Sequence, residues 1–107
     1  MLVDARTPEE QAVSMLPGAI TQQEFERRAE DFKGRRVVAY CTIGYRSGEY
    51  TEALRADGWD AHNLSGSILA WTHAGQPLET PDGAPTKRLH IYGPKWDLAA
   101  EGYETVY

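Results

Sequence analysis

One cysteine stands in the sequence, and its neighbours are of the types that turn a thiol into a nucleophile. Cys41 follows four residues of strand character, 37–40, and residues 48–56 after it have the composition of a helix. A loop that joins a strand to a helix can direct several backbone N–H groups inward, and the helix adds the positive end of its dipole. Both effects favour the thiolate, which is the nucleophilic form of cysteine. We therefore predict that Cys41 is a catalytic nucleophile.

The residues that follow Cys41 are predicted to surround a bound anion. Gly44 permits the positive φ that a tight curl requires. Arg46 carries a charge that would close the loop and attract an anionic substrate. Ser47 is expected to cap the following helix, with contact to the sulfur as a second role for its hydroxyl, and Tyr45 would line the mouth. The predicted substrate-binding loop consists of Thr42, Ile43, Gly44, Tyr45, Arg46 and Ser47.

Strand-like and helix-like segments alternate around this loop. Residues 2–4, 37–40 and 59–64 have strand character. Helix starts are predicted at Thr7 and Thr21, each followed three residues later by a glutamate in the spacing of a capping box. Phe25 and Phe32 would share one face of the second helix. The alternation predicts an α/β domain with a parallel sheet and places Cys41 at the carboxyl end of a central strand.

Residues 40–47 resemble the active-site loop of the rhodanese-like sulfurtransferases. Residues 3–10, 16–20 and 64–71 are similar to the family motifs that lie before and after that loop, so the resemblance covers approximately residues 2–78. The chain departs from the family pattern at Ser14-Met15, where Gly-His is usual, and at Ser67, where a second glycine is usual. The second departure predicts a slightly different position for the loop that contains Ser67.

The resemblance implies a rhodanese-like three-layer α/β fold, in which helices flank a central parallel sheet that lacks the usual first strand. It implies a domain over residues 1–78 and leaves residues 79–107 as a C-terminal extension. Aromatic residues and a strand-like alternation at 87–92 predict that this extension packs on the domain, at the edge that the missing strand would fill, or on a neighbouring copy in a homodimer. Asp4 and Arg6 are expected to form a supporting ion pair or backbone brace near the loop.

The activity that the resemblance implies is sulfur transfer. Sulfane sulfur would pass from thiosulfate or a similar small anionic donor to Cys41 as a persulfide, and then to cyanide, a small thiol or a protein thiol. The chain has no second cysteine that could resolve a bond at Cys41, so the sulfur must leave to another molecule. No cofactor and no metal are expected, because the three histidines lack the spacing of metal ligands.

Two alternatives stay open from the sequence. A cysteine-dependent phosphatase or arsenate reductase also has a cysteine loop closed by an arginine, but usually with five residues between them, and four lie between Cys41 and Arg46. The shorter loop suits one added sulfur atom better than a tetrahedral phosphate. A rhodanese-like module that only binds or regulates a partner is the other alternative, and the presence of Cys41 argues against it, since degenerate members often lose the cysteine.

Composition excludes several other classes of protein. A net charge of −5 argues against a nucleic-acid partner, which would require a basic face. The sequence has no run of about 18 apolar residues, so no membrane span is predicted. A single cysteine and the lack of a visible signal peptide predict a reducing cytoplasm. The length of 107 residues is typical of one domain.

Overall fold

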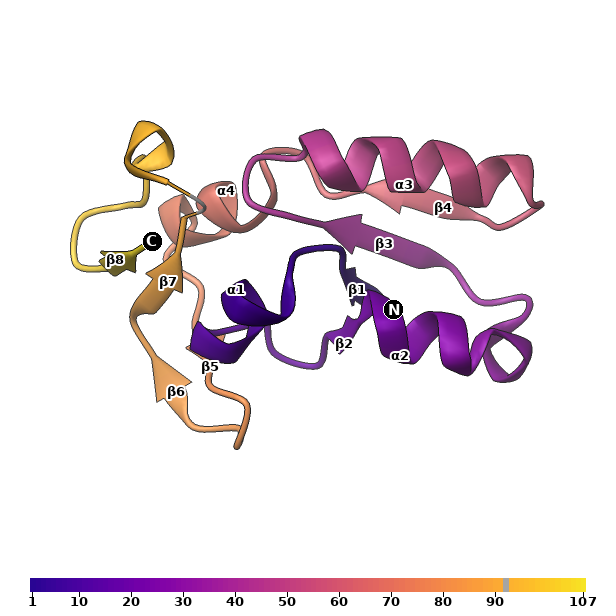
Figure 1. Cartoon of the computed structure of the whole chain (residues 1–107), viewed down its shortest axis with the longest axis horizontal. Helices are drawn as coiled ribbons and strands as arrows, with labels where there is room; N and C mark the ends of the chain where they lie inside the picture. The colour runs from indigo at the N-terminus through magenta and orange to yellow at the C-terminus, as the bar shows by residue number, and fades with distance from the viewer. Residues whose placement is uncertain (92) are drawn as a thin grey trace.

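A four-stranded parallel sheet forms the centre of the computed structural model, which describes residues 1–91 and 93–107 and, at position 96, the backbone alone (Figure 1). The strand order is β2-β1-β3-β4, and Val3 of β1 pairs with β2 on one side and with β3 on the other. The strands are β1 (Leu2–Asp4), β2 (Ile20–Thr21), β3 (Val37–Tyr40) and β4 (Ala61–Asn63). The predicted α/β architecture with a parallel central sheet is confirmed.

Helices join these strands and cover the sheet. They are α1 (Pro8–Val13), α2 (Gln22–Arg27), the 3-10 helix η1 (Ala29–Phe32), α3 (Tyr45–Ala56) and α4 (Ser67–His73). A second 3-10 helix, η2 (Pro94–Trp96), lies in the C-terminal segment. Within residues 1–91 and 93–107, no helix combines the length and the apolar character that crossing a bilayer requires.

The predicted helix starts are correct, whereas one helix is shorter than predicted. Thr7 Oγ1 accepts the N–H of Glu10 at 3.4 Å while the Glu10 carboxylate accepts the N–H of Thr7 at 3.1 Å, which completes a capping box. Thr21 caps α2 through its hydroxyl alone, which accepts the N–H of Glu24 at 3.0 Å. The helix predicted to carry both Phe25 and Phe32 ends at Arg27, because the next residue leaves helical backbone geometry, and Phe32 lies on η1.

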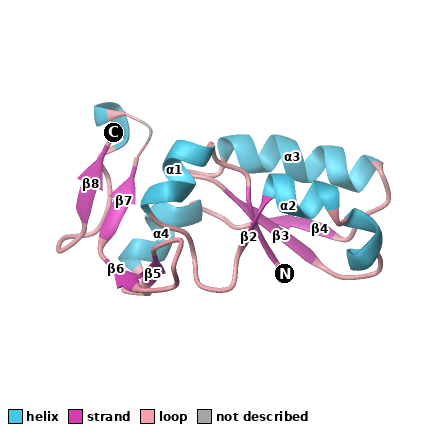
Figure 2. Cartoon of the chain, turned by 60° about the horizontal axis from the view of Figure 1, so that its bottom comes forward, coloured by secondary structure: helices cyan, strands magenta, loops and turns pink. Residues whose placement is uncertain are grey.

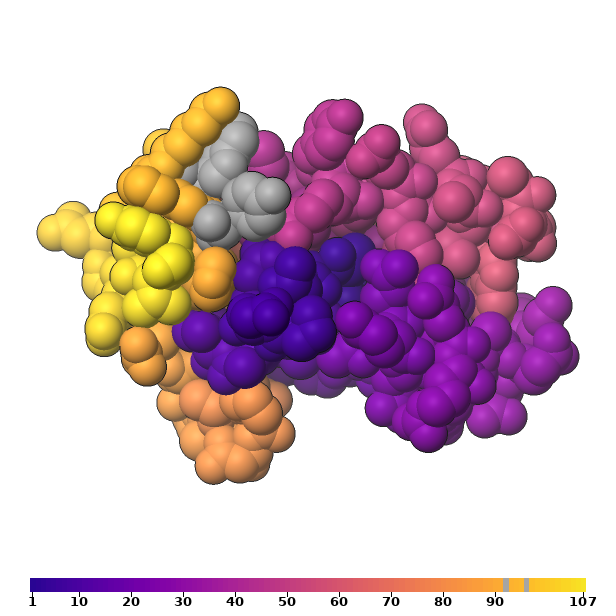
Figure 3. Space-filling view, in the orientation of Figure 1, coloured from indigo at the N-terminus to yellow at the C-terminus, as the bar shows by residue number. Residues whose placement is uncertain are grey.

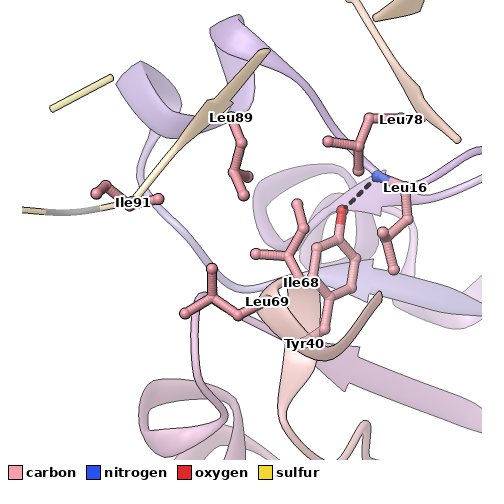
Figure 4. Packing of buried hydrophobic residues seen from close by; sticks show 7 residues of the cluster. All are labelled: Leu16, Tyr40, Ile68, Leu69, Leu78, Leu89 and Ile91. Carbon is pink, nitrogen blue, oxygen red and sulfur yellow. Dashed lines mark hydrogen bonds between the residues drawn. The ribbon is translucent and has the colours of Figure 1, made fainter. Parts of the chain in front are cut away.

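Alternate strand residues face opposite sides of the sheet, and each side has its own apolar core. The cluster under α2, η1 and α3 consists of Val3, Phe25, Phe32, Val37, Leu54 and Ala61. The cluster on the other side includes residues of α4 and of the C-terminal segment and consists of Leu16, Tyr40, Ile68, Leu69, Leu78, Leu89 and Ile91 (Figure 4). Figure 2 shows α2 and α3 together along the sheet, with α4 apart from them and close to the C-terminal segment.

Residues 79–107 pack on the rest of the chain and form one end of the molecule, against the N-terminal segment (Figure 3). β5 (Leu78–Glu79) pairs antiparallel with β6 (Pro85–Thr86), and β7 (Arg88–His90) pairs parallel with β8 (Glu104–Val106). Leu89 and Ile91 are fully buried. The Ser14 hydroxyl donates to the carbonyl of Arg88 at 2.6 Å.

This arrangement corrects one prediction about the extension. A strand exists within residues 87–92, but β7 pairs with β8 and adds no strand to the central sheet, because Leu89 is held in the core beside α4. The expectations for Tyr92 and for the side chain of Trp96 lie outside the described residues. The domain boundary after residue 78 and the homodimer stay predictions.

Candidate active site

The strand order places the candidate site at the carboxyl edge of the sheet. β1 leads through α1 to β2 on one side, whereas β3 lies on the other side of β1, so the connections that leave β1 and β3 diverge. Such a switch point is where parallel α/β sheets open a crevice for ligands. Cys41 directly follows β3, Asn63 ends β4, and Glu10 lies on α1 after β1.

Three donors converge on the sulfur of Cys41. The N–H of Gly44 lies 3.1 Å from Sγ, the N–H of Ser47 3.5 Å, and the Ser47 hydroxyl 3.3 Å. Burial raises the pKa of the thiol, since Cys41 is 1% exposed. The hydrogen bonds from Ser47 and Gly44 and the charge of Arg46 outweigh that effect and leave the pKa below its ordinary value. The surroundings therefore favour a thiolate.

Of the two contacts predicted for Ser47, the helix cap is wrong and the contact of its hydroxyl with the sulfur is present. α3 begins at Tyr45, three residues earlier than predicted, and its N-cap is Gly44 at a φ of +109°, a conformation that favours glycine. Ser47 therefore lies inside the first helical turn and does not cap the helix. Because the first N–H groups of a helix have no partner within it, the N–H of Ser47 can bind the Cys41 sulfur.

Arg46 is held by a carboxylate that comes from α1. Its Nη1 lies 2.7 Å from Oε1 of Glu10 and its Nη2 3.0 Å from Oε2. The hydroxyl of Thr42 accepts from Nη2 at 2.9 Å and donates to Glu10 at 3.1 Å, so Thr42 contributes its side chain as well as its backbone. Burial would raise the pKa of Glu10, but Arg46 and the N–H of Thr7 lower it to about 2. This network closes the loop, and attraction of an anion by Arg46 stays a prediction.

Asp4 and Arg6 form the predicted supporting ion pair. Arg6 Nη2 lies 2.6 Å from Asp4 Oδ2, both side chains are fully buried, and Arg6 also donates to the carbonyl of Ser14 at 2.6 Å. The same carboxylate accepts the hydroxyl of Tyr40 at 2.7 Å. Tyr40 immediately precedes Cys41, and its hydroxyl accepts the N–H of Leu16 at 3.1 Å. The pair thus fixes the end of β3 from which the cysteine emerges.

The start of α4 holds the backbone of Cys41. Ser67 Oγ accepts the N–H of Cys41 at 3.1 Å, and the N–H of Ile68 donates to the carbonyl of Cys41 at 3.1 Å. Leu69 likewise donates to the carbonyl of Thr42 at 3.2 Å. These donors are helix-terminal N–H groups that need partners outside the helix. Ser67 has a φ of +50°, so the chain keeps the left-handed backbone that favours glycine while it adds a hydroxyl that anchors the cysteine.

Asn63 contacts the loop from the end of β4. Its amide nitrogen donates to the carbonyl of Gly44 at 3.0 Å, and its amide oxygen accepts the hydroxyl of Ser47 at 2.6 Å. The amide of Asn63 packs closely against Gly48. A Cβ atom at that position would lie 3.2 Å from the amide nitrogen, so a larger residue would crowd it. Asn63 therefore braces both the curl of the loop and one of the groups that contact the sulfur.

Sequence reasoning missed the functional position of three residues. Glu10 was assigned only to a capping box, and Ser67 was noted only as a departure from a family pattern. Asn63 was read as part of a strand, and its place directly before the turn into α4 was the one available signal. At the rim of the loop, Tyr45 is 71% exposed and Ile43 37% exposed, and a role of Tyr45 in lining the mouth stays a prediction. Among residues 1–91 and 93–107, no three His, Cys, Asp or Glu side chains form a group that could hold a metal.

Comparisons with known proteins place this chain in a family. A family model described as "Rhodanese-like domain" matches residues 1–74. A protein of Allochromatium vinosum named "Sulfurtransferase" is 39% identical over 87 residues, which cover 78% of this chain and 81% of that protein.

Solved structures agree with this match. The rhodanese-like domain protein of Staphylococcus aureus superposes with a TM-score of 0.62 at 32% identity, over 75% of this chain and 79% of that one. The thiosulfate sulfurtransferase of Pseudomonas aeruginosa superposes with a TM-score of 0.65 at 29% identity, over 75% of this chain but 17% of that longer chain.

Proposed function

The chain belongs to the rhodanese-like domain family, and from this premise we propose that it is a sulfurtransferase whose Cys41 carries sulfane sulfur as a persulfide. The observation that carries the proposal is the convergence of the Gly44 N–H, the Ser47 N–H and the Ser47 hydroxyl on one sulfur atom. Donors in this arrangement stabilise a sulfur anion, and both the attacking thiolate and the persulfide are sulfur anions. The relative named a sulfurtransferase supports the same chemistry.

In the first step, the Cys41 thiolate attacks the outer sulfur of thiosulfate. A sulfur–sulfur bond forms to Cys41, the bond to the sulfite group breaks, and sulfite leaves with the electron pair. The product is a persulfide anion on Cys41, so the total negative charge is unchanged. After this step the negative charge lies on the outer sulfur, one bond beyond Sγ, and the inward-facing donors of the loop would stabilise it there.

In the second step, a thiophilic acceptor takes the outer sulfur. Cyanide would attack it, form thiocyanate and release the Cys41 thiolate with the electron pair. A small thiol or a protein thiol is the other acceptor class that we propose. Because the two half-reactions share one enzyme form with bound sulfur, ping-pong kinetics are expected. We also propose that the protein works in a reducing cytoplasm, where the single cysteine stays unpaired between turnovers.

Intact-protein mass spectrometry after incubation with thiosulfate tests this proposal. We expect a gain of one sulfur atom that cyanide or a reductant reverses and that Cys41→Ser abolishes. No gain with thiosulfate or any other sulfane donor, in a protein shown to be folded, would leave a non-catalytic binding module as the better account. Hydrolysis of p-nitrophenyl phosphate that depends on Cys41, without sulfur uptake, would instead favour a phosphatase.

A further inference from the structure

The hydroxyl of Ser47 has more acceptors within reach than hydrogens to donate. Its oxygen lies 2.6 Å from Oδ1 of Asn63, 3.3 Å from Sγ of Cys41 and 3.4 Å from Oγ of Ser67. A serine hydroxyl carries one hydrogen. Donation to Asn63 and donation to the sulfur therefore compete, and the shorter distance favours Asn63 while the sulfur is a neutral thiol.

The orientation of the Asn63 amide is set by the loop itself. The carbonyl of Gly44 can only accept, and it lies 3.0 Å from the amide nitrogen, so the amide oxygen must face Ser47. Ser67 Oγ gives its own hydrogen to the carbonyl of Leu64 at 3.1 Å, so it is not a donor to Ser47. As an acceptor it lies 3.4 Å away, beyond the usual O–H···O range, so the amide oxygen and the sulfur are the two main destinations of the Ser47 hydrogen.

We propose that Asn63 is a positioning residue that tunes the ionisation of Cys41 by holding the Ser47 hydroxyl hydrogen until a negative sulfur draws it away. A thiolate is a stronger acceptor than a thiol, and hydrogen bonds to charged groups are roughly twice as strong as neutral ones. The hydrogen moves toward Sγ when the sulfur is ionised and returns to Asn63 when it is not. Asn63 thereby keeps the thiolate less stabilised, and more nucleophilic, than an uncontested hydroxyl would leave it.

The charged groups that bear on Cys41 leave this competition intact. Arg46 from α3 lowers the pKa of the thiol, and Glu10 from α1 pairs with Arg46. The groups contributed from β4 and α4, Asn63 and Ser67, are uncharged. Substitution of Asn63 therefore changes neither a formal charge nor the Arg46–Glu10 pair. The effect of this substitution on turnover rests on the proposed function, whereas its effect on the pKa of the Cys41 thiol does not.

A double-mutant cycle on the thiol pKa tests the proposal. The chain has one cysteine, so protein labelled with carbon-13 at cysteine Cβ has one signal whose pH dependence reports Cys41 alone. We expect Asn63→Leu, which keeps a similar shape and removes the amide acceptor, to lower the Cys41 pKa by about 0.5–1 pH unit, a fraction of one charge-assisted hydrogen bond. In the Ser47→Ala background the same substitution should leave the pKa unchanged. Ser65→Ala, on the exposed turn after β4, is the matched control and should have no effect.

The opposite results are equally clear. A fall of the same size in the Ser47→Ala background would mean that Asn63 acts only through its brace on Gly44, and an unchanged or raised pKa in folded Asn63→Leu would refute the competition.

The wild-type protein provides a measurement that needs no substitution of Asn63, the only asparagine in the chain. Its side-chain amide signals should shift with the same midpoint as Cys41 and should lose most of that shift in Ser47→Ala. Signals that do not respond to Cys41 would also contradict the proposal.

Discussion

The Glu10 carboxylate holds both terminal nitrogens of Arg46, at 2.7 and 3.0 Å, although 36 residues separate the two in the chain. Glu10 is 1% exposed and Arg46 30% exposed, so the pair is partly shielded from water and salt. It ties the first helix to the end of the cysteine loop. The sequence suggested Arg46 as a group that attracts an anion. In the structure its main contact is this ion pair, which holds the loop closed.

Replacing this carboxylate should loosen the loop. We expect Glu10→Gln to lower the free energy of unfolding by about 2 kcal/mol, less than a fully buried pair would lose because Arg46 is partly exposed. Urea unfolding measures the change. Glu9→Gln is the matched control on the exposed side of α1 and should be near neutral. Equal stability of Glu10→Gln and Glu9→Gln would show that the pair contributes nothing net.

The same carboxylate makes stability depend on acid. Its pKa is lowered from 4.5 to about 2 in the folded protein, so the folded state binds its proton less readily than the unfolded chain. The stabilisation is therefore complete above pH 4.5 and is lost as the pH falls toward 2. Unfolding measured between pH 5 and pH 2 should show a steep loss in the wild type. Glu10→Gln should reduce that slope, and an unaltered slope would assign the acid sensitivity to other carboxylates.

Ser67 combines a strained backbone with a useful hydroxyl, and two substitutions separate these effects. Ser67→Ala keeps the φ of +50° and leaves the buried Cys41 N–H without a partner, which should cost about 1–3 kcal/mol. Ser67→Gly loses the same hydrogen bond but relieves the left-handed backbone, so it should be less destabilised by about 1 kcal/mol. Thermal and urea unfolding of both variants provide the comparison. A glycine variant that is the less stable of the two would rule out this account of the strain.

Tyr40 links the strand before the cysteine to the turn at Leu16. Tyr40→Phe removes a hydroxyl that donates to Asp4 at 2.7 Å and accepts the N–H of Leu16 at 3.1 Å. The dashed line in Figure 4 marks the contact with Leu16. Since both partners are buried, we expect a loss of about 2–3 kcal/mol in the free energy of unfolding. Amide hydrogen exchange at Leu16 should accelerate. Unchanged protection of that amide would indicate that it finds another acceptor.

The C-terminal segment is predicted to belong to the same folding unit as the sheet. Leu89 is fully buried beside residues of α4, and Leu89→Ala should cost about 2–4 kcal/mol through lost burial and a residual cavity. Leu98→Ala, at a residue that is 58% exposed, should change stability by less than about 0.5 kcal/mol. One cooperative transition in both variants, followed by circular dichroism and by tryptophan fluorescence, would fit a single unit. Separate transitions would support an independent tail.

Local patterns in the sequence were sufficient for two helix starts and for the strand–loop–helix unit around Cys41. Thr7 with Glu10, and Thr21 with Glu24, marked the starts of two helices because capping depends on residues three positions apart. The apolar run before Cys41 and the helical composition after it marked the strand–loop–helix unit, because both signals are confined to neighbouring residues. Gly44 was correctly assigned to a left-handed position for the same reason.

Tertiary structure alone decided which side chains of other elements hold the loop around Cys41. Glu10, Asn63 and Ser67 are brought to the loop from α1, β4 and α4 by the order of the strands in the sheet, and no local spacing records that order. Ser47 keeps its predicted contact with the sulfur but not its predicted capping role, since the helix begins earlier with Gly44 as its N-cap. Local propensities act over a few residues, whereas the competition for one hydroxyl hydrogen arises only where separate strand ends meet.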